Sequence, residues 1–488
     1  MKKLWRMIPV WAMAVGLMLT ACAKVDTPVP PTTPTTDDPK EPEEMVLDGV
    51  VVEHEPTATM TYNNTEYDIS AYQSMSLDDI LGNFMTDDKQ PSKQKFYLRG
   101  GKAYHLSSPL SVIKGFTLCT HPQDLAQGKR ATVYLSAMIE ADGSVPTCNF
   151  MLSRTAGEGE NPDDPAAMLK IDSLCFKDID FDAPLARNAG DGNASGNYFI
   201  NVYSNNVLGF NLEALVIQNC TFQRIIRGFA RFQNNAKKVI NHFTVEGCLF
   251  YNCGYYNSNG RSYNWFNGDP SSNAETNMFV DMVFRNNTIY DSPLGYLFTS
   301  NNRNLTFTSG YNITVENNTF VNFNTRANNI YLVSMRYLPG DSKITIKKNL
   351  FIQTKQEGDT RDMYFAGADV RNITGSASAV FDIADNYSTN AFLTEGEIFS
   401  AASFAATKNS FGLWPAMNIG GAEALKVIAD DIAPTELMVN PNPPFTAADA
   451  AKMHHVDNLS GLYYQNTEKV RQSAIYKLGI GDPRWRQQ

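Results

Sequence analysis

The sequence lacks the motifs of several common enzyme classes. Its seven cysteines form no Cys-x-x-Cys pair and its six histidines show no metal-ligand spacing, so a zinc centre is not expected. A Gly-x-Ser-x-Gly element and a phosphate-binding glycine-rich loop are also missing. Enzymes built on those two motifs therefore find no support in this sequence.

Positive charge is scarce as well. The 488 residues carry 41 Lys and Arg against 51 Asp and Glu, a formal charge of −10. An acidic chain of this kind is not expected to bind nucleic acid or to be attracted broadly to anionic lipid. With 43% hydrophobic residues, however, the chain has enough apolar surface for a large core.

Only one hydrophobic run is long enough to concern a membrane, and it lies at the N-terminus. Three cations precede an apolar stretch from Met7 to Leu19, which suits a signal peptide and is short for a membrane span. The run ends in Leu19-Thr20-Ala21-Cys22, which resembles a bacterial lipobox. We expect residues 1–21 to be a lipoprotein signal peptide and Cys22 to carry the lipid; the alternative is a secretory signal with a chance cysteine.

Residues 22–44 are rich in proline, threonine and acidic side chains, a composition that favours an extended tether over a packed core. A lipid anchor followed by a spacer resembles the surface lipoproteins of Bacteroidetes glycan-uptake systems. The resemblance implies a protein anchored in the outer membrane, at the cell surface, with other glycan-uptake proteins as possible partners.

Asparagine is unusually abundant, with 45 copies in all and 28 of them between residues 201 and 350. Many belong to a template that recurs seven times: apolar, any, apolar, any, any, a turn slot, any, apolar. The turn slot holds Asn or Cys in six copies. The copies begin at Leu174, Leu215, Phe243, Met282, Ile313, Ile344 and Phe381.

Apolar residues at every second position predict a short β-strand in each copy, and the asparagine predicts a turn because its side chain tolerates the left-handed conformation. The irregular spacing of the copies suits coils with loops of variable length. We therefore predict an all-β fold, a right-handed parallel β-helix over residues 96–400, with amides and phenylalanines stacked from coil to coil. The alternative is an ordinary Asn-rich β-sandwich.

The opening coils are predicted at Phe96–Leu106 and Leu110–Leu118, and the chain closes on Gly481-Asp482-Pro483-Arg484-Trp485. With the repeat, these features resemble the pectin-lyase-like superfamily, in particular pectin-lyase-like lipoproteins of the Bacteroidetes type that end in this way. The similarity covers residues 95–488. Residues 45–95 and 401–488 are expected to cap the two ends of the stack, since an open parallel edge is prone to pairing.

The residue after the second apolar slot should point outward, and four copies place Glu246, Arg285, Glu316 and Lys347 in one row. The resemblance implies a polysaccharide lyase, in which Arg285 or Lys347 would be the catalytic base and Ca²⁺ a possible cofactor. Calcium prefers clustered carboxylates, which this row does not provide. The alternative is a row of salt bridges on the sheet surface.

An insertion at about 251–280 combines aromatic side chains with Gly and Asn. Aromatic rings stack on sugar faces, and Asn or Arg can bond hydroxyl groups. The alternative is that the aromatics pin the loop onto the body of the protein. The candidate glycan-binding residues are Tyr255, Tyr256, Arg261, Tyr263 and Trp265.

Two further clusters leave alternatives open. Cys220 and Cys248 share the turn slot of consecutive copies, where they could form a disulfide or remain stacked free thiols. A basic run is interpreted as a solvated loop face. Its members are Arg224, Arg227, Arg231, Lys237 and Lys238.

The function expected from these features is binding of a polysaccharide, pectin-like or another acidic glycan, by a cell-surface lipoprotein. A lyase that cleaves uronate-containing glycan by β-elimination is the first alternative. An adhesin or structural surface protein is the second.

Overall fold

The chain divides into two units, Met1–Glu41 and Pro42–Gln488, and the computed structural model describes parts of the second unit only. The described residues are 43–47, 50–54, 66–69, 75–89, 92–136, 148–162, 164–185, 198–201, 207–225, 228–232, 238–251, 253, 265–267, 277–292, 297–300, 310–323, 329–352, 364–374, 379–388, 425–427, 432, 434–437 and 465–486. Cys22, the predicted signal peptide and most of the predicted tether lie outside them.

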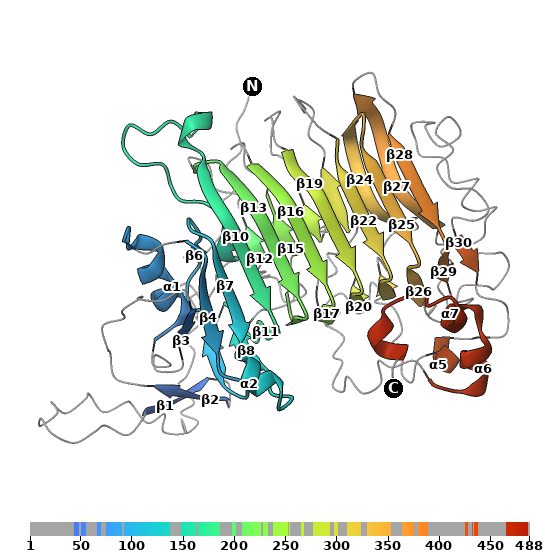
Figure 1. The fold of residues 1–488 in the computed structure, drawn as a ribbon, viewed down its shortest axis with the longest axis horizontal. Coiled ribbons are helices and arrows are strands. Elements are labelled where there is room, and N and C mark those ends of the chain that lie inside the picture. The colour runs from blue at the N-terminus through green and yellow to red at the C-terminus, as the bar shows by residue number, and fades with distance from the viewer. Residues whose placement is uncertain are drawn as a thin grey trace, which may run out of the picture. The chain divides into compact units, whose positions relative to one another are not determined.

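The described chain is mostly β-structure and contains three long sheets in which every neighbouring pair of strands is parallel (Figure 1). Sheet 1 contains β3 (Glu66–Asp68), β4 (Gln94–Leu98), β7 (Phe116–Thr120), β10 (Leu169–Lys177), β13 (Phe210–Gln218), β16 (Lys238–Glu246), β19 (Asn277–Arg285), β22 (Asn312–Glu316), β25 (Lys343–Lys347) and β28 (Val380–Ala384). Sheet 2 contains β5 (Ala103–His105), β8 (Ala131–Tyr134), β11 (Ile179–Asp182), β14 (Thr221–Gln223), β17 (Leu249–Tyr251), β20 (Thr288–Ser292), β23 (Thr319–Phe323), β26 (Leu350–Ile352), β29 (Asn386–Ser388) and β30 (Leu425–Val427). Sheet 3 contains β6 (Leu110–Ser111), β9 (Cys148–Met151), β12 (Tyr198–Asn201), β15 (Gly228–Arg231), β18 (Phe266–Asn267), β21 (Phe298–Ser300), β24 (Asn329–Pro339) and β27 (Tyr364–Thr374).

Consecutive strands enter the sheets in a fixed cycle. From β4 to β27 the chain passes from sheet 1 to sheet 2, then to sheet 3 and back to sheet 1. Three consecutive strands of this cycle are called a coil below. The parallel pairing excludes the antiparallel β-sandwich for the described strands and is consistent with a parallel β-helix. Pairing also extends beyond residues 96–400, to β3 at one end and β30 at the other.

The strand register confirms the seven-copy template. The first apolar residues of the seven copies pair in order along sheet 1. Their side chains point inward, while the residues between the two apolar slots lie on the outer face. Equivalent residues of successive copies are therefore neighbours across one strand spacing, which is about 4.8 Å.

At the corner between sheets 1 and 2, the structure shows the backbone conformation and the side-chain direction of the turn-slot asparagines. The left-handed residue is the one before the turn slot, with φ between 53° and 65° at Asp178, Asn219, Gly247, Asn286, Asn317, Lys348 and Asp385. The expectation that the turn-slot asparagine itself adopts this conformation was wrong. That asparagine instead points inward, where burial requires its amide to find partners within the protein.

The predicted amide stack is present in the described coils. Asn287, Asn318, Asn349 and Asn386 are fully buried. Each of the first three donates from its backbone N–H (2.9–3.1 Å) and its side-chain amide (2.9–3.1 Å) to the Oδ1 of the next asparagine. The stack ends at Cys248, whose backbone N–H donates to Asn287 Oδ1 at 2.8 Å.

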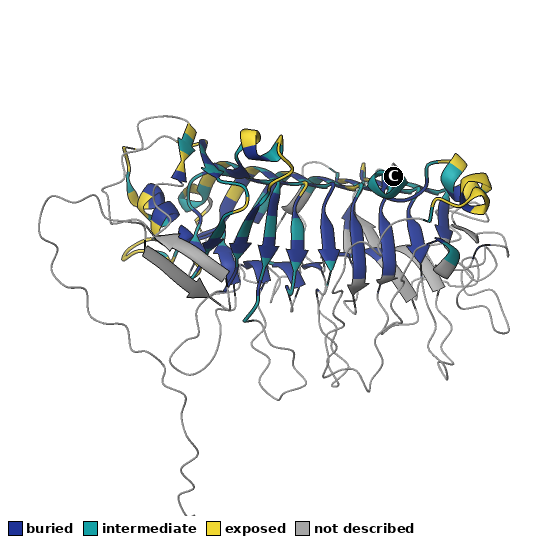
Figure 2. Cartoon of the chain, turned by 90° about the horizontal axis from the view of Figure 1, so that it is seen from below, coloured by how far each residue is buried: buried dark blue, intermediate teal, exposed yellow. Residues whose placement is uncertain are grey.

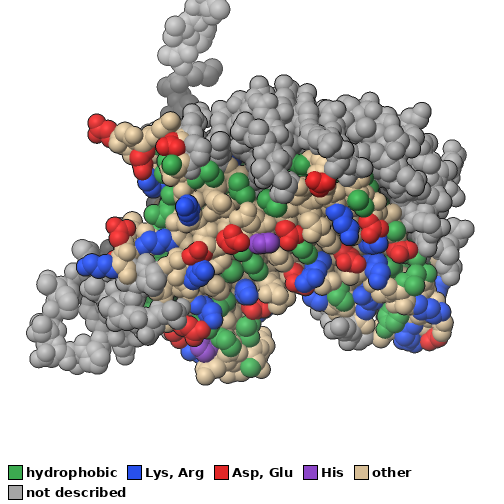
Figure 3. All heavy atoms as spheres, turned by 45° about the horizontal axis from the view of Figure 1, so that its top comes forward, with side chains coloured by type: hydrophobic (Ala, Val, Ile, Leu, Met, Phe, Trp, Pro, Cys, Tyr) green, Lys and Arg blue, Asp and Glu red, His purple; other side chains and the backbone are tan. Residues whose placement is uncertain are grey.

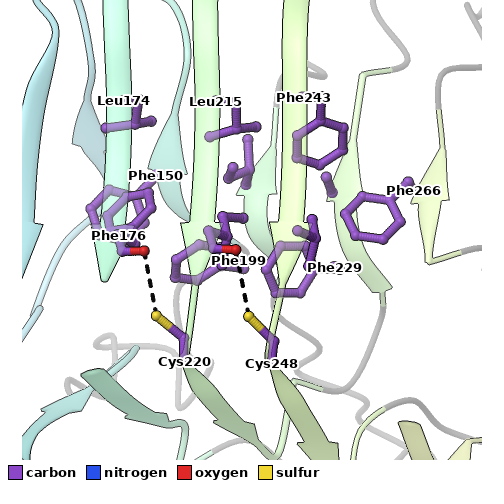
Figure 4. Packing of buried hydrophobic residues seen from close by; sticks show 14 of the residues in the cluster. Phe150, Leu174, Phe176, Phe199, Leu215, Cys220, Phe229, Phe243, Cys248 and Phe266 are labelled. Carbon is purple, nitrogen blue, oxygen red and sulfur yellow. Dashed lines mark hydrogen bonds between the residues drawn. The ribbon is translucent and has the colours of Figure 1, made fainter. Parts of the chain in front are cut away.

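Phenylalanines fill the interior between the sheets, as predicted. Phe222 stacks on Phe181 and on Phe250, with ring centroids 5.1 and 5.0 Å apart and planes within 9° of parallel. Figure 4 shows Phe199, Phe229 and Phe266 of sheet 3 pointing into this interior, beside the phenylalanines of sheet 1. Sheet 3 was not predicted, because its strands are short or irregular and fit no common template.

The remaining described elements lie beside the sheets. β1 (Glu43–Leu47) and β2 (Val50–His54) form an antiparallel pair. Helix α1 (Leu77–Thr86) buries its apolar face in the main core and packs Phe84 on Phe96, with ring centroids 5.3 Å apart. Helix α2 (Pro122–Leu125) follows β7, and 3₁₀ turns span Pro165–Ala167 and Pro483–Arg486. Exposed positions gather on helices and connecting segments in Figure 2, while the strands are largely buried.

The C-terminal segment, comprising residues 432, 434–437 and 465–486, covers part of the outer face of sheet 2. It contains α5 (Pro434–Leu437), α6 (Glu468–Gln472) and α7 (Ala474–Lys477). Its buried residues Ile432, Leu437, Val470, Ile475 and Ile480 form a second apolar cluster with residues of β17, β20, β23, β26 and β29. This segment of the predicted cap therefore contacts the side of the coils, whereas β30 pairs with β29 at the end of sheet 2. The rest of residues 401–488 lies largely outside the described chain.

Lys238 is a fully buried lysine at the start of β16. Burial lowers its pKa from 10.5 to about 7. Between these values the unfolded chain binds a proton that the folded protein does not, so the free energy of unfolding rises with pH, by at most about 1.4 kcal/mol per pH unit.

We expect Lys238→Met to raise the unfolding temperature at pH 7 and to flatten the dependence of that temperature on pH between 7 and 10, measured by circular dichroism. Lys343→Met, at an exposed position, serves as the control, and equal slopes in both variants would contradict the prediction.

Candidate functional site

The row that contains Arg285 and Lys347 lies on the outer face of sheet 1. Register pairs Glu246 with Arg285, Arg285 with Glu316, and Glu316 with Lys347, so no other strand intervenes. The short turn that follows each strand at the sheet 1–sheet 2 corner holds all four side chains near one edge of the sheet. The predicted alternation of charge is therefore present in the structure.

Both basic residues of this row are engaged with acids on neighbouring strands. Arg285 donates from Nε and Nη2 to the two carboxylate oxygens of Glu246, at 2.8 and 3.1 Å. Lys347 Nζ lies 2.7 Å from Asp382 Oδ1 on β28. The hydrogen bonds that Arg285 donates to Glu246 raise the pKa of the guanidinium above its ordinary value. A guanidinium held in this way keeps its proton, so the geometry favours the interpretation as surface ion pairs.

A second polar row, not predicted from the sequence, lies on the same face. His242 Nδ1 is 3.2 Å from Asp281 Oδ2, and His242 Nε2 is 3.9 Å from Glu213 Oε1. Asn312 Nδ2 donates to Asp281 Oδ1 at 3.1 Å, and Lys343 follows Asn312 in the register. Acidic, basic and histidine side chains are mixed along the described surface in Figure 3.

This second row has a sequence signal that is easy to miss. Its members from β16 to β25 are the residues just before the first apolar slot of four successive template copies. Because the coils differ in length, these residues are 39, 31 and 31 positions apart and show no motif spacing. A template extended by one residue would have found them.

The insertion at 251–280 does not form one continuous loop. Tyr251 ends β17, β18 occupies Phe266–Asn267, and Asn277 begins β19. Tyr255, Tyr256, Arg261 and Tyr263 lie outside the described residues. The ends of the 252–264 connection belong to sheets 2 and 3, whereas Arg285 and Lys347 end strands of sheet 1.

Trp265, the remaining candidate of this loop, belongs to the core. It is fully buried, and its ring lies 5.0 Å from that of Phe250 and 6.5 Å from that of Phe229, centroid to centroid. A ring in this position offers no face to a sugar, so the glycan-binding role predicted for Trp265 does not fit its burial. Its position agrees with the alternative that an aromatic side chain pins the loop.

The basic run predicted as a solvated face is divided by the structure. Lys238 is buried, Arg224 pairs with Asp182, and Arg231 lies over the ring of Tyr198 with its guanidinium carbon 4.5 Å from the centroid. Arg227 and Lys237 lie outside the described residues. The described members therefore occupy three separate environments.

The six described cysteines are free thiols, and Cys220 and Cys248 are stacked without a disulfide (Figure 4). Their sulfurs donate to Phe176 O at 3.5 Å and to Ile217 O at 3.6 Å. Among the residues that the structure describes, no group of three or more His, Cys, Asp or Glu side chains could hold a metal ion.

Burial makes most of these thiols poor nucleophiles. It raises the pKa of Cys119 to about 11 and that of Cys148 and Cys253 to about 12, and it raises that of Cys220 as well. Since the thiolate is the reactive form, we expect Ellman's reagent to label native protein that begins after Cys22 only at half-buried Cys175. Unfolding should expose all six thiols. Fast labelling of a native Cys175→Ser variant would contradict this prediction.

No described helix combines the length and the hydrophobicity needed to cross a lipid bilayer. Comparisons with models of protein families, with curated proteins and with solved structures gave no significant match. The functional argument therefore depends on this chain's own residues.

Proposed function

We propose that this protein is a cell-surface lipoprotein that binds polysaccharide through a right-handed parallel β-helix of the pectin-lyase-like kind. The cycle of strands through three parallel sheets and the aligned asparagines support this fold. The lipobox at Leu19–Cys22 and the tether up to residue 44 support a lipid anchor in the outer membrane. Partner proteins of a glycan-uptake system would then act beside it on the same surface.

The observation that carries the binding proposal is the outer face of sheet 1. From β16 to β25, four strands whose register is regular from His242 onward present two polar rows, separated by a middle row that contains three threonines (Thr244, Thr314 and Thr345). A linear glycan advances by about one strand spacing per sugar. Lying across the strands, it would meet donors and acceptors of the same kind at each coil.

Arg285, Lys343 and Lys347 place cations at intervals among the acids of this face, where the carboxylates of an acidic glycan could bond. Lys343 is exposed on β25 and makes no ion pair with another described residue. Arg285, half exposed, could bond a uronate while still contacting Glu246. We therefore propose a pectin-like or other acidic polysaccharide as the ligand. The engaged state of Arg285 and Lys347 supports binding over β-elimination.

Affinity electrophoresis of the folded protein, from which the signal peptide and Cys22 have been removed, tests this proposal. The gels contain polygalacturonate, alginate, xylan or galactan. We expect retardation by an acidic glycan and at least about fivefold weaker binding by Lys343→Ala/Asn312→Ala, which corresponds to roughly 1 kcal/mol. Lys469→Ala on α6 is the matched control, because its lysine also lies at the surface but pairs with Glu436.

Three outcomes would overturn the proposal or revise it. If none of these glycans retards the wild-type protein, polysaccharide binding is wrong and an adhesin or structural role is favoured. Equal binding by the double variant would exclude this face. New ultraviolet absorbance from unsaturated uronates, with or without Ca²⁺, would show that the protein is a lyase.

A further inference from the structure

The outer face of sheet 2 changes character along its length. In the later coils its outward residues Tyr290, Val321 and Ile352 are buried beneath the C-terminal segment. In the earlier coils the same column is only half buried and becomes polar and aromatic. Register places its members on five successive strands, in the order His105, Tyr134, Asp182, Gln223 and Tyr251.

Tyr134, Asp182, Gln223 and Tyr251 form a cluster with Arg224. This cluster is named the Tyr134–Tyr251 row below. Arg224 Nε donates to Asp182 Oδ1 at 2.7 Å, and its Nη2 donates to Asp182 Oδ2. Tyr251 Oη donates to Gln223 Oε1 at 3.1 Å. The hydroxyl groups of Tyr251 and Tyr134 also interact electrostatically with the Arg224 guanidinium.

The backbone of Arg224 holds this arrangement at a cost. Its φ of +60° lies in the left-handed region, which a non-glycine residue rarely adopts outside turns. The guanidinium reaches Asp182 on β11, the strand that pairs with β14. Nη1 of Arg224 makes no hydrogen bond with another described residue.

The row is electrically neutral, since Asp182 and Arg224 compensate each other and Tyr134, Gln223 and Tyr251 carry no formal charge at neutral pH. A neutral row gives no preference for a polyanion. It combines two tyrosine rings, three strand spacings or about 14 Å apart, with carboxylate, amide and guanidinium groups between them. Rings that stack on C–H faces, and polar groups that bond adjacent hydroxyls, are the chemistry that recognises neutral pyranose sugars.

We propose that the Tyr134–Tyr251 row is a second glycan-binding site, which takes a stretch of about three neutral sugars. The inference rests on the proposed polysaccharide-binding function and adds to it. Sheet 1 would contact the acidic part of a glycan and sheet 2 an uncharged part. The C-terminal segment limits the site by burying the same column from β20 onward.

Isothermal titration with neutral tetrasaccharides of xylose, galactose, mannose and glucose, together with the acidic polymers used for sheet 1, tests this proposal. We expect Tyr134→Ala to weaken binding of one neutral tetrasaccharide by at least tenfold and to leave acidic-polymer binding within twofold of wild type. Gln223→Ala, which removes no packing in the core, should weaken binding of the same neutral tetrasaccharide by about threefold. Tyr97→Ala on β4 of sheet 1 is the matched control, because it removes a half-buried tyrosine outside both sites.

The outcomes separate the two proposals. Binding of acidic polymer with no response to any neutral tetrasaccharide would refute the second site and leave the first intact. The second site would also be refuted if Tyr134→Ala and Gln223→Ala bind neutral sugars as tightly as Tyr97→Ala does. If the wild-type protein binds neither the acidic polymers nor any neutral tetrasaccharide, both proposals are refuted.

Discussion

Asn318→Ala is expected to lower the free energy of unfolding by about 3–5 kcal/mol, one of the two largest effects that we predict. The Oδ1 of Asn318 accepts from the backbone and side-chain N–H groups of Asn287, at 2.9 and 3.1 Å. Its Nδ2 donates to Phe284 O and to Asn349 Oδ1, both at 2.9 Å. Alanine would leave several of these buried groups without partners, and each such group costs about 1–3 kcal/mol.

The measurement is thermal and urea unfolding followed by circular dichroism. Asn312→Ala is the matched control, because Asn312 lies in the same coil but is exposed on the outer face of sheet 1. We expect its effect to stay within about 0.5 kcal/mol. An equal loss of stability in the two variants would show that the buried amide stack contributes nothing beyond a surface asparagine.

The second large effect is expected at the C-terminal Gly-Asp-Pro-Arg-Trp sequence. Asp482 is fully buried, accepts from Thr288 Oγ1 at 2.8 Å and forms an ion pair with Arg484 at 2.5 Å. Arg484 also donates to Gly247 O and Cys248 O, at 2.5 and 2.9 Å. Together with the bonds from Asp482 N to Thr319 Oγ1 at 2.9 Å and from Gly481 N to Lys348 O at 2.8 Å, these contacts tie the segment to four successive coils.

Arg484→Ala should therefore lower stability by about 3–5 kcal/mol, because it leaves the buried Asp482 carboxylate without its countercharge. The unfolding midpoint is the primary measurement, and faster proteolysis of the C-terminal segment is the second. Removing both partners, in Asp482→Ala/Arg484→Ala, should cost less than the sum of the single changes.

Arg471→Ala provides the comparison for the ion pair of Arg484. Arg471 pairs with Glu468 at 2.9 Å on α6, and both side chains are well exposed. An exposed pair of this kind contributes about 0–1 kcal/mol. If Arg484→Ala were as mild as Arg471→Ala, the closing sequence would not be a tie between coils.

Part of the candidate site could be predicted from the sequence. Placing Arg285 beside Glu246 requires only the template, because equivalent positions of adjacent copies must be neighbours in a parallel register. The contact of Lys347 with Asp382 was not predicted. The register pairs Lys347 with Ala384, and the long lysine side chain reaches Asp382, two residues earlier on the same strand. The aromatic insertion was treated as one surface loop because nothing in its composition marks the two-residue strand β18.

The sequence by itself determined the seven template strands of sheet 1, the stacked amides and the stacked phenylalanines, since each follows from a side-chain period repeated from copy to copy. Only the tertiary structure decided where sheet 3 runs, that Trp265 is buried, and which half of the outer face of sheet 2 the C-terminal segment covers. These features depend on contacts between residues far apart in the chain, such as Arg484 with Gly247, for which no local period exists. Periodic packing leaves a pattern in the sequence, whereas a single long-range contact leaves none.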